Sequence, residues 1–331
     1  MDKKRHHYVP KAYLRSFCDD TDKLLLYRKD EPFRAITLSV ENAALQNYYY
    51  SQPTPEGGTD HNSLEDFFSK TEEKWPGIVD RLHRREDVND SLEDIFQFIA
   101  LQRVRVPACR DVVEKVEGER AKSIARRLDV EGKLPSKPKG FEDILDHVEA
   151  PINPHLSIHA MPPLIEGIGQ VFSRIGLGAL HNKTTVQFLT SDNPVVWFDP
   201  SVLEADLKPY VLRPGGPLVL LFPVSPFLLL YGHTSILEQF VSSGLGHADL
   251  VEADFVEMIN RQVCRFGYEA IFVRSAEQEQ LIREQAAMSP TVCFERINTS
   301  KVEAAIFQMI FGKRERKPKW VEEPDSQQTA S

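Results

Sequence analysis

Two adjacent histidines near the N-terminus are the first side chains in this sequence that can carry chemistry. His6 and His7 are followed closely by Val9 and Pro10. Histidine changes charge near neutral pH, so it can serve as a general acid or base, and its neutral ring binds metals. Neighbouring side chains on extended backbone point to opposite sides, so we expect only one ring to face a ligand. The alternative is that the pair ties the N-terminus to the fold through hydrogen bonds.

A glutamine and an arginine three residues apart form a second candidate. Gln102 and Arg105 lie on one face of a predicted helix. The planar guanidinium group matches a carboxylate or a phosphate, which makes Arg105 a candidate anion clamp and Gln102 a candidate substrate-binding residue. A buried arginine also needs an anionic partner. The alternative is therefore an internal salt bridge to Glu65, Glu72 or Asp192.

A polar turn between two apolar segments is the third candidate. Ser191-Asp192-Asn193-Pro194 separates two segments of strand-like composition. Loops at strand ends often carry functional groups on a rigid scaffold. Asp192 is then a general base or a metal ligand, and Asn193 hydrogen-bonds a substrate. The alternative is an Asx-type turn in which these side chains bond to their own backbone.

The sequence contains no specific metal-binding motif. The four cysteines lie far apart, without a Cys-x-x-Cys pair. Glu65 and Glu72 are spaced two helical turns apart, which suits either a divalent cation or a solvated helix face. His155 and His159 have i, i+4 spacing, but no Glu follows His155 as a zinc-protease motif requires. A divalent cation therefore stays an open alternative without a motif to support it.

The elements that position these residues follow from the hydrophobic pattern. Segments 23–28 and 34–40 are typical of a β-hairpin, and 48–50 of a short further strand. Helical periodicity follows from about 60 to 176, with bends expected at Pro76 and Pro107. A helix is predicted over 248–266, among strands at 184–190, 195–198, 218–222, 227–231 and 269–273. We predict the α+β class, with the N-terminal hairpin and the C-terminal strands in one mixed or antiparallel sheet and a helical middle segment.

Length and patterning predict a single folded unit with an extension. Residues 1–275 are expected to form one domain, with a helical subregion at about 60–176. The hydrophobic pattern weakens beyond this point, so 276–331 reads as a C-terminal extension. Its last part is polar and is expected to be disordered.

Composition limits the class of protein and of partner. The chain has 331 residues and a net charge of −9, which argues against a general nucleic-acid binder, although a local basic groove stays compatible with it. No apolar run approaches the ~18 residues that a membrane span needs. The charged start lacks the apolar centre of a signal peptide, and scattered cysteines are typical of reduced thiols. We therefore expect a cytoplasmic protein without a membrane partner.

Four short motifs occur in a fixed order along the chain. They are His6-His7-x-Val9-Pro10, Leu101-Gln102-x-x-Arg105-x-Pro107, Thr190-Ser191-Asp192-Asn193-Pro194-Val195 and Pro223-x-Ser225-Pro226. In this order, from His6 to about Val273, the chain resembles the bacterial domain-of-unknown-function family 4238 (DUF4238). Lys11 and Val224 depart from the family pattern, and neither is one of the candidate polar residues. The resemblance implies no reaction, so function has to be argued from the residues.

Two hypotheses of function follow. The mixture of imidazole, guanidinium, carboxylate and amide groups predicts a hydrolase of a phosphate-bearing substrate, with a nuclease as one form. An imidazole is then the acid or base, the guanidinium stabilises phosphoryl charge, and the amides orient the substrate. The catalytic candidates are His6, His7, Arg105 and Asp192, and the substrate-binding candidates are Gln102 and Asn193.

The second hypothesis is a non-catalytic binding or sensor module. In it the same residues form a buried hydrogen-bond network that fixes the N-terminus against the helical middle. Solvent access separates the two hypotheses, because a site needs an open pocket whereas a network is buried and internally satisfied.

Overall fold

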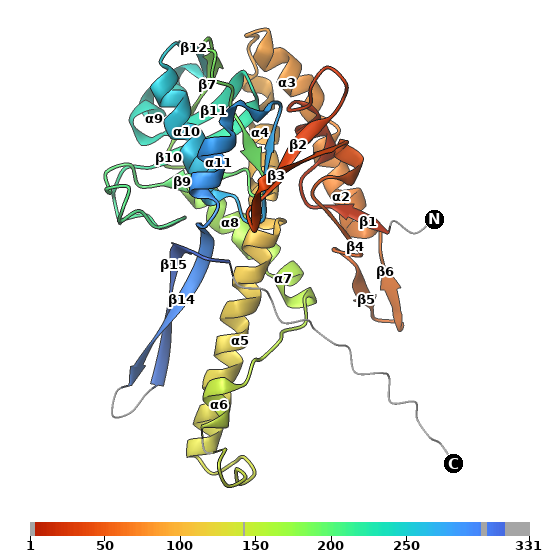
Figure 1. Ribbon diagram of the computed structural model, residues 1–331, viewed down its shortest axis with the longest axis vertical. Coiled ribbons are helices and arrows are strands. Elements are labelled where there is room, and N and C mark those ends of the chain that lie inside the picture. The colour runs from red at the N-terminus through yellow and green to blue at the C-terminus, as the bar shows by residue number, and fades with distance from the viewer. Residues whose placement is uncertain (1–3, 142, 299–302, 315–331) are drawn as a thin grey trace.

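Two β-sheets form the centre of the molecule. The computed structural model describes residues 4–141, 143–298 and 303–314 (Figure 1). One sheet has the strand order β3-β2-β13-β8, so the N-terminal hairpin shares a sheet with C-terminal strands, as predicted. The other has the order β12-β7-β11-β10-β9 and is antiparallel except for the parallel β12–β7 pair. The α+β prediction is confirmed.

The first sheet combines strands that are far apart in the sequence, whereas all strands of the second sheet lie within residues 176–250. The first sheet contains β2 (Leu24–Arg28), β3 (Glu31–Leu38), β8 (Thr190–Ser191) and β13 (Ala270–Val273). The second contains β7 (Gly176–Asn182), β9 (Val196–Phe198), β10 (Val219–Ser225), β11 (Leu228–His233) and β12 (Gly246–Leu250). Helices α9 (Leu237–Ser243) and α10 (Ala253–Phe266) lie between β11 and β13 in the chain.

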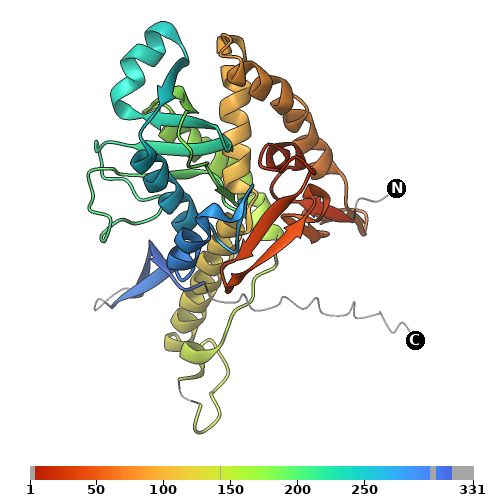
Figure 2. The same cartoon turned by 45° about the horizontal axis from the view of Figure 1, so that its top comes forward.

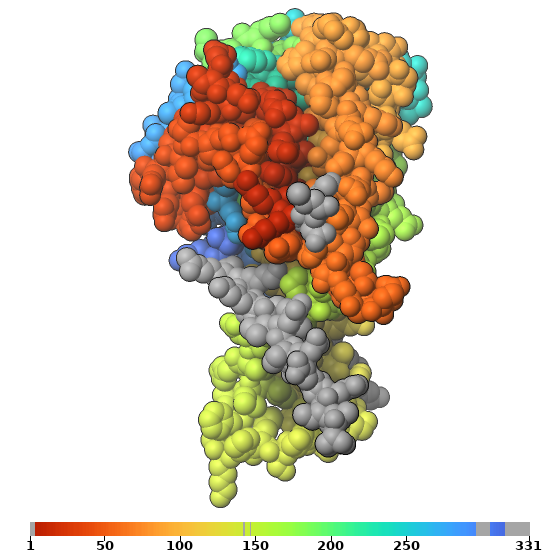
Figure 3. All heavy atoms as spheres, turned by 90° about the vertical axis from the view of Figure 1, so that its right-hand side faces the viewer, coloured from red at the N-terminus to blue at the C-terminus, as the bar shows by residue number. Residues whose placement is uncertain are grey.

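The N-terminal segment runs across the helical middle. It contains β1 (Arg5–His7), α1 (Lys11–Arg15), β4 (Leu45–Asn47), β5 (Gln52–Thr54) and β6 (Gly58–Asp60). Strand β1 pairs with β4, and β5 pairs with β6, both antiparallel. In the space-filling view, the red and red-orange residues of this segment lie above the yellow-green residues near α6 and beside the lighter orange helices that follow in the chain (Figure 3).

The helical middle consists of seven helices in the described ranges. They are α2 (Ser63–Glu72), α3 (Trp75–His83), α4 (Leu92–Val104), α5 (Pro107–Val130), α6 (Ile144–His147), α7 (His155–His159) and α8 (Met161–Phe172). Pro107 begins α5 rather than bending one long helix, because the first helical position needs no backbone N–H donor. The second half of α4 is buried on all sides, and α5 projects below the sheets (Figure 1).

One aromatic cluster joins these layers. The Trp75 and Phe98 rings stack with centroids 3.9 Å apart, and the Tyr13 ring lies 5.2 Å from that of Phe222. The Tyr13 hydroxyl lies 2.6 Å from Thr190 Oγ1 and donates to the carbonyl of Pro223 at 2.7 Å. Helix α1 is therefore fixed to α3, α4, β8 and β10 at once.

Two predicted strands are wrong, each for a local reason. Residues 48–50 form a turn, with Tyr48 in the left-handed region at φ 56° and the N–H of Ser51 bonded to the Tyr48 carbonyl. Of the segment 184–190, only Thr190 belongs to a strand, whereas the unpredicted β7 begins at Gly176. A Cβ atom at Gly176 would lie 2.3 Å from the Ile236 carbonyl, so the close approach of this carbonyl requires a glycine in the strand.

The described part of the C-terminal extension is folded. It contains α11 (Glu279–Gln285) and the hairpin of β14 (Ser289–Asn298) and β15 (Glu303–Gly312), which projects from the body near α5 (Figure 2). Lys29 Nζ anchors its base by donating to the carbonyl of Met288 as well as to two carbonyls at the end of α10. The tail predicted to be disordered lies outside the described residues. None of the helices described is long and apolar enough to cross a membrane.

Candidate functional site

Arg105 lies where the N-terminal segment crosses the end of α4. Its side chain is 2% exposed, and its Nη1 donates to Glu72 Oε1 at 2.6 Å. Its Nε and Nη2 donate to the carbonyls of Tyr8 and His7 at 3.0 and 2.9 Å. The internal salt bridge to Glu72 is thus confirmed. The N–H donors of Arg105 that were predicted to bind an external anion are therefore bonded to Glu72 and to two backbone carbonyls of the chain.

The two histidines point to different surroundings, as expected for extended backbone. His6 is fully buried, and its Nδ1 accepts the backbone N–H of Tyr50 at 2.9 Å while the rings stack 5.6 Å apart. Burial, with Lys11 next in effect, lowers the pKa of His7 to about 4. His7 is therefore neutral at pH 7. Its Nε2 is buried and has no hydrogen-bond partner in the described part of the chain.

Asp192 holds the start of β13. Its Oδ1 accepts the N–H of Tyr268 at 2.8 Å, and its Oδ2 accepts the N–H of Glu269 at 2.7 Å. Burial, followed by the negative charge of Glu269, raises the pKa of Asp192 to about 7. The carboxylate thus bonds to backbone distant in the sequence rather than to its own turn.

Several amide and guanidinium atoms near this turn lack partners. Asn193 Nδ2 donates to the Tyr210 hydroxyl at 2.6 Å and to the Phe266 carbonyl at 2.7 Å, whereas its Oδ1 has no partner. Both amide atoms of Gln102 are buried without a partner, and so are Nε and Nη1 of Arg103, whose guanidinium lies 3.8 Å from the Tyr210 ring centroid. These absences refer to the described residues. Buried polar atoms of this kind need bound water or a ligand.

Five of the six predicted site residues are buried and His7 is half-buried. Arg105 contacts the backbone of the N-terminal segment, whereas Asp192 and Asn193 contact the segment 266–269 before β13. We call the six residues together the motif layer. Three cavities of about 510–560 Å³ in the described ranges are lined by other residues. In these ranges, no group of three or more His, Cys, Asp or Glu side chains is arranged to hold a metal. The motif layer consists of His6, His7, Gln102, Arg105, Asp192 and Asn193.

One cavity adjoins the motif layer, and we call it the Arg110 cavity. Its volume is about 510 Å³. One wall comes from the turn after β4 and from β5–β6, and the other from α5 and the start of α7. Figure 3 shows the orange β5–β6 hairpin beside the green residues of α7. The lining residues are Tyr48, Tyr49, Ser51, Pro53, Thr59, His61, Arg110, Asn153, Pro154 and His155.

Arg110 brings a buried positive charge to this cavity. The residue is 3% exposed. Its Nε donates to Ser157 Oγ at 2.9 Å, Nη1 to the Tyr49 carbonyl at 2.6 Å and Nη2 to the Pro154 carbonyl at 3.0 Å. Within the described chain, none of these acceptors is a carboxylate, and no Asp or Glu lines the cavity. Three of the five guanidinium N–H groups are used, so two stay available.

A serine and a histidine form a pair on the opposite wall. Ser51 Oγ lies 2.7 Å from His61 Nδ1, and Ser51 is 8% exposed. The His61 ring packs against the Tyr48 ring with centroids 4.9 Å apart. Immediately before His61, Asp60 Oδ1 accepts the N–H groups of Asn62 and Ser63. The backbone on both sides of His61 is therefore fixed, and the imidazole itself contacts Ser51 and Tyr48.

The motif layer supports the turn that carries the cavity. His6 accepts the N–H of Tyr50, and the Tyr50 hydroxyl donates to the Arg105 carbonyl at 3.4 Å. Arg110 binds the carbonyl of the preceding residue, Tyr49, and its guanidinium lies 4.1 Å from that ring's centroid. His6 and Arg105 therefore both hold Tyr50, which lies in the chain between the lining residues Tyr49 and Ser51.

The comparison with protein families identifies the family of the chain. A family model described as "Protein of unknown function (DUF4238)" matches residues 5–277. The chain belongs to the DUF4238 family. The resemblance carried by the four motifs is confirmed, and the match covers the motif layer and every residue lining the Arg110 cavity. No curated protein and no solved structure matches this DUF4238 chain.

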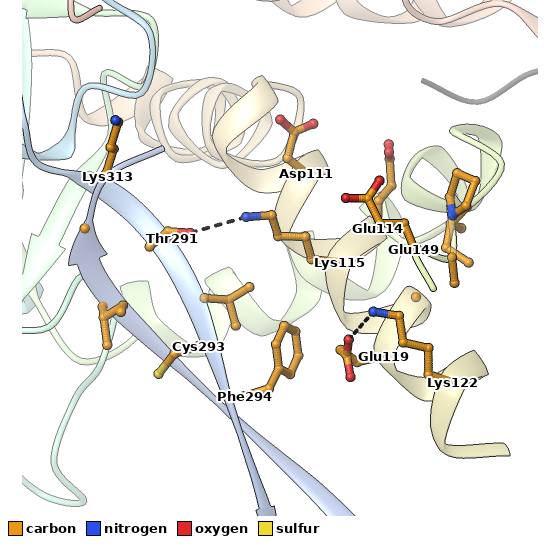
Figure 4. Close-up of a pocket in the computed structure, with 17 residues that line it drawn as sticks. Asp111, Glu114, Lys115, Glu119, Lys122, Glu149, Thr291, Cys293, Phe294 and Lys313 are labelled. Carbon is orange, nitrogen blue, oxygen red and sulfur yellow. Dashed lines mark hydrogen bonds and ion pairs between the residues drawn. The ribbon is translucent and has the colours of Figure 1, made fainter. Parts of the chain in front are cut away.

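A second cavity of the DUF4238 protein lies between α5 and the β14–β15 hairpin (Figure 4). Lysines and carboxylates alternate along its helical wall, and Lys122 pairs with Glu119 at 2.7 Å. Lys115 Nζ lies 3.5 Å from Thr291 Oγ1 on the strand wall. Its charges are mixed, and the strand wall lies beyond the family match. This cavity is therefore a weaker candidate for a family site.

Sequence reasoning missed the residues of the Arg110 cavity. Segment 51–59 holds two prolines and two glycines, a composition typical of a loop, and Arg110 lies on a helix rich in charge. The available indication was Ser51 and His61 flanking this loop. Their pairing depends on the β5–β6 hairpin, which no pattern in the sequence predicted.

Proposed function

We propose that this DUF4238 protein binds a small phosphate-bearing molecule in the Arg110 cavity, and that the motif layer holds the fold around it. One observation carries the proposal: a buried guanidinium borders a cavity, and no carboxylate accepts its hydrogen bonds in the described chain. The buried carboxylate of Glu114 is linked to Arg110 only through Ser157 Oγ, so within the described residues the guanidinium has no direct ionic partner. A buried charge in this state is costly. An anionic ligand supplies that partner.

The other lining groups suit a tetrahedral anion. Arg110 retains two N–H donors, and a fork of this kind matches phosphate geometry. The hydroxyl of Ser51, the imidazole of His61 and the amide of Asn153 line the same cavity and add donors. A volume of about 510 Å³ is typical of a pocket for one small molecule.

Each of the two functional hypotheses drawn from the sequence supplies one part of this function. The phosphate-bearing ligand comes from the hydrolase hypothesis. The role of the motif layer comes from the network hypothesis, because Arg105 and Asp192 already direct their polar atoms to Glu72 and to backbone groups. Catalysis by these motif residues stays a prediction that this geometry does not favour.

Calorimetric titration with inorganic phosphate tests the proposal. The wild-type protein is expected to bind phosphate more tightly than acetate. His155→Gln and Arg110→Gln are each expected to weaken phosphate binding tenfold or more, which corresponds to about 1.4 kcal/mol. His83→Gln is the matched control, because His83 lies at the end of α3 and does not line the cavity.

Circular dichroism establishes that each variant is folded, and His155→Gln keeps the test valid if Arg110→Gln does not fold. Absence of phosphate binding by the wild-type protein contradicts the proposal. So does wild-type affinity in the folded cavity variants.

A further inference from the structure

The geometry points to Ser51 as a nucleophile toward phosphate monoesters, with His61 as its general base. This inference rests on the proposed function, because the Arg110 cavity must first bind the phosphate group. It assigns chemistry to two residues outside all four family motifs.

The pair has the geometry that nucleophilic catalysis requires. Ser51 Oγ and His61 Nδ1 are 2.7 Å apart, within the range for proton transfer along a hydrogen bond. Both residues line the cavity that contains Arg110. A catalytic base must also be held in one orientation, and the packing of the His61 ring against the Tyr48 ring does this.

The backbone next to the pair is in an unusual conformation. Tyr48 has φ 56°, a region that bulky residues rarely occupy. The turn that follows is held by the Tyr48 carbonyl, which accepts the N–H of Ser51, and by His6, which accepts the N–H of Tyr50. Strain maintained by several surrounding contacts is a recurring feature of functional sites.

The first chemical step forms a phosphoserine. Ser51 Oγ gives its proton to His61 Nδ1 and attacks phosphorus, while the bond from phosphorus to the leaving alcohol breaks. The leaving oxygen departs in line on the other side and takes a proton from protonated His155, which lines the opposite wall on α7. The two free N–H groups of Arg110 stabilise charge on the phosphoryl oxygens.

Water completes the cycle. It attacks the phosphoserine phosphorus and gives a proton to His155, and Ser51 Oγ leaves and recovers its proton from His61. The balance is one phosphate monoester and one water consumed, and one alcohol and one inorganic phosphate formed. The step needs no other reactant.

Turnover of p-nitrophenyl phosphate by the full chain tests this inference. We expect release of p-nitrophenol by the wild-type protein, no release above background by Ser51→Ala and a rate lowered about 10²-fold or more by His61→Gln. Ser69→Ala is the matched control, because Ser69 Oγ on α2 bonds to the Glu65 carbonyl away from the cavity. Acid-quenched protein is expected to carry a phosphoryl group on Ser51 in peptide mass spectrometry.

Phosphate titration of the same variants separates this inference from the proposed function. If the wild-type protein binds phosphate but neither turns over the ester nor becomes labelled, the nucleophile is contradicted and the binding proposal stands. Turnover that persists in a folded Ser51→Ala variant also contradicts it. If the wild-type protein binds no phosphate and shows no turnover, both proposals fall.

Discussion

The motif layer and the Arg110 cavity each contain a buried arginine, and the two arginines differ in the partners that the chain supplies. Arg105 and Arg110 are both buried and both donate to two backbone carbonyls. Arg105 also pairs with Glu72, whereas the third bond of Arg110 goes to the hydroxyl of Ser157. Of these two residues, Arg110 lines one of the three cavities described above and Arg105 lines none of them. Two buried arginines of the same chain can therefore have different roles. The partners of the guanidinium, and not the residue type, decide whether it supports the fold or binds a ligand.

The histidines repeat this contrast. His6 uses its ring to hold the backbone of Tyr50, and the ring is fully buried. His61 pairs with the hydroxyl of Ser51 at the wall of a cavity. The first arrangement positions a turn. The pair of Ser51 and His61 lines a cavity, so a ligand bound there can reach both side chains.

The largest expected effect is loss of stability on breaking the motif layer. Arg105→Met removes the partner of Glu72 and of two carbonyls, and we expect the free energy of unfolding to fall by about 3–5 kcal/mol. Urea denaturation measures it. Arg28→Met, which removes an exposed pair with Asp30, is the control and should cost less than about 1 kcal/mol. If the free energy of unfolding falls equally in both variants, the buried contacts of Arg105 contribute no more than an exposed ion pair, and its structural role is contradicted.

Ligand-induced stabilisation should belong to the cavity alone. Phosphate at about 100 times its dissociation constant is expected to raise the free energy of unfolding of the wild-type protein by about 2.7 kcal/mol. His155→Gln should remove most of that gain at the same phosphate concentration, and His83→Gln should keep it. Thermal unfolding with and without phosphate measures the difference. A gain that His155→Gln leaves intact places the ligand elsewhere.

Asp192 should make the protein less stable as pH rises. Burial raises its pKa from 3.8 to about 7, so its contribution to stability is complete below pH 4 and is lost between pH 4 and 7. We expect the unfolding free energy of the wild-type protein to fall by about 1–2 kcal/mol more over this range than that of Asp192→Asn. Urea denaturation at several pH values gives both slopes. Parallel slopes would show that Asp192 titrates normally.

His7 should have a smaller effect of opposite sign. Its pKa is lowered from 6.5 to about 4, so its contribution is present above pH 6.5 and is lost as pH falls toward 4. His7→Gln should remove up to about 1 kcal/mol of this acid-induced loss, since the ring is half-buried. NMR titration of the His7 ring checks the cause directly. A normal midpoint near pH 6.5 would contradict it.

The sequence predicted the fold where periodicity was strong. Local patterns predicted the N-terminal hairpin, the helical middle and the helix over 248–266, because apolar residues recur along each of them. The sheet that joins the hairpin to the strand near residue 270 was also expected. The unpredicted β7 contains Gly176, which is required by the nearby Ile236 carbonyl rather than by any local preference. The turn at Tyr48 requires Tyr48 itself to adopt a left-handed backbone conformation, which a bulky side chain does not favour.

The candidate site was predictable only in part. The motifs led to the buried polar residues, and the salt bridge between Arg105 and Glu72 was among the expected alternatives. The partners of Arg110 are Tyr49, Pro154 and Ser157, which are 44–61 residues away in the sequence. No local pattern contains such information, because it arises only when the turn, α5 and α7 pack together.

A crystal structure with bound tungstate, a heavy phosphate analogue, shows which of the two regions binds the anion. We expect an anomalous-scattering peak in the Arg110 cavity within hydrogen-bond distance of the Arg110 guanidinium, and no peak in the motif layer. A peak bound to Arg105 or beside Asp192, with the cavity empty, would contradict phosphate binding in the cavity and make the motif layer the ligand site.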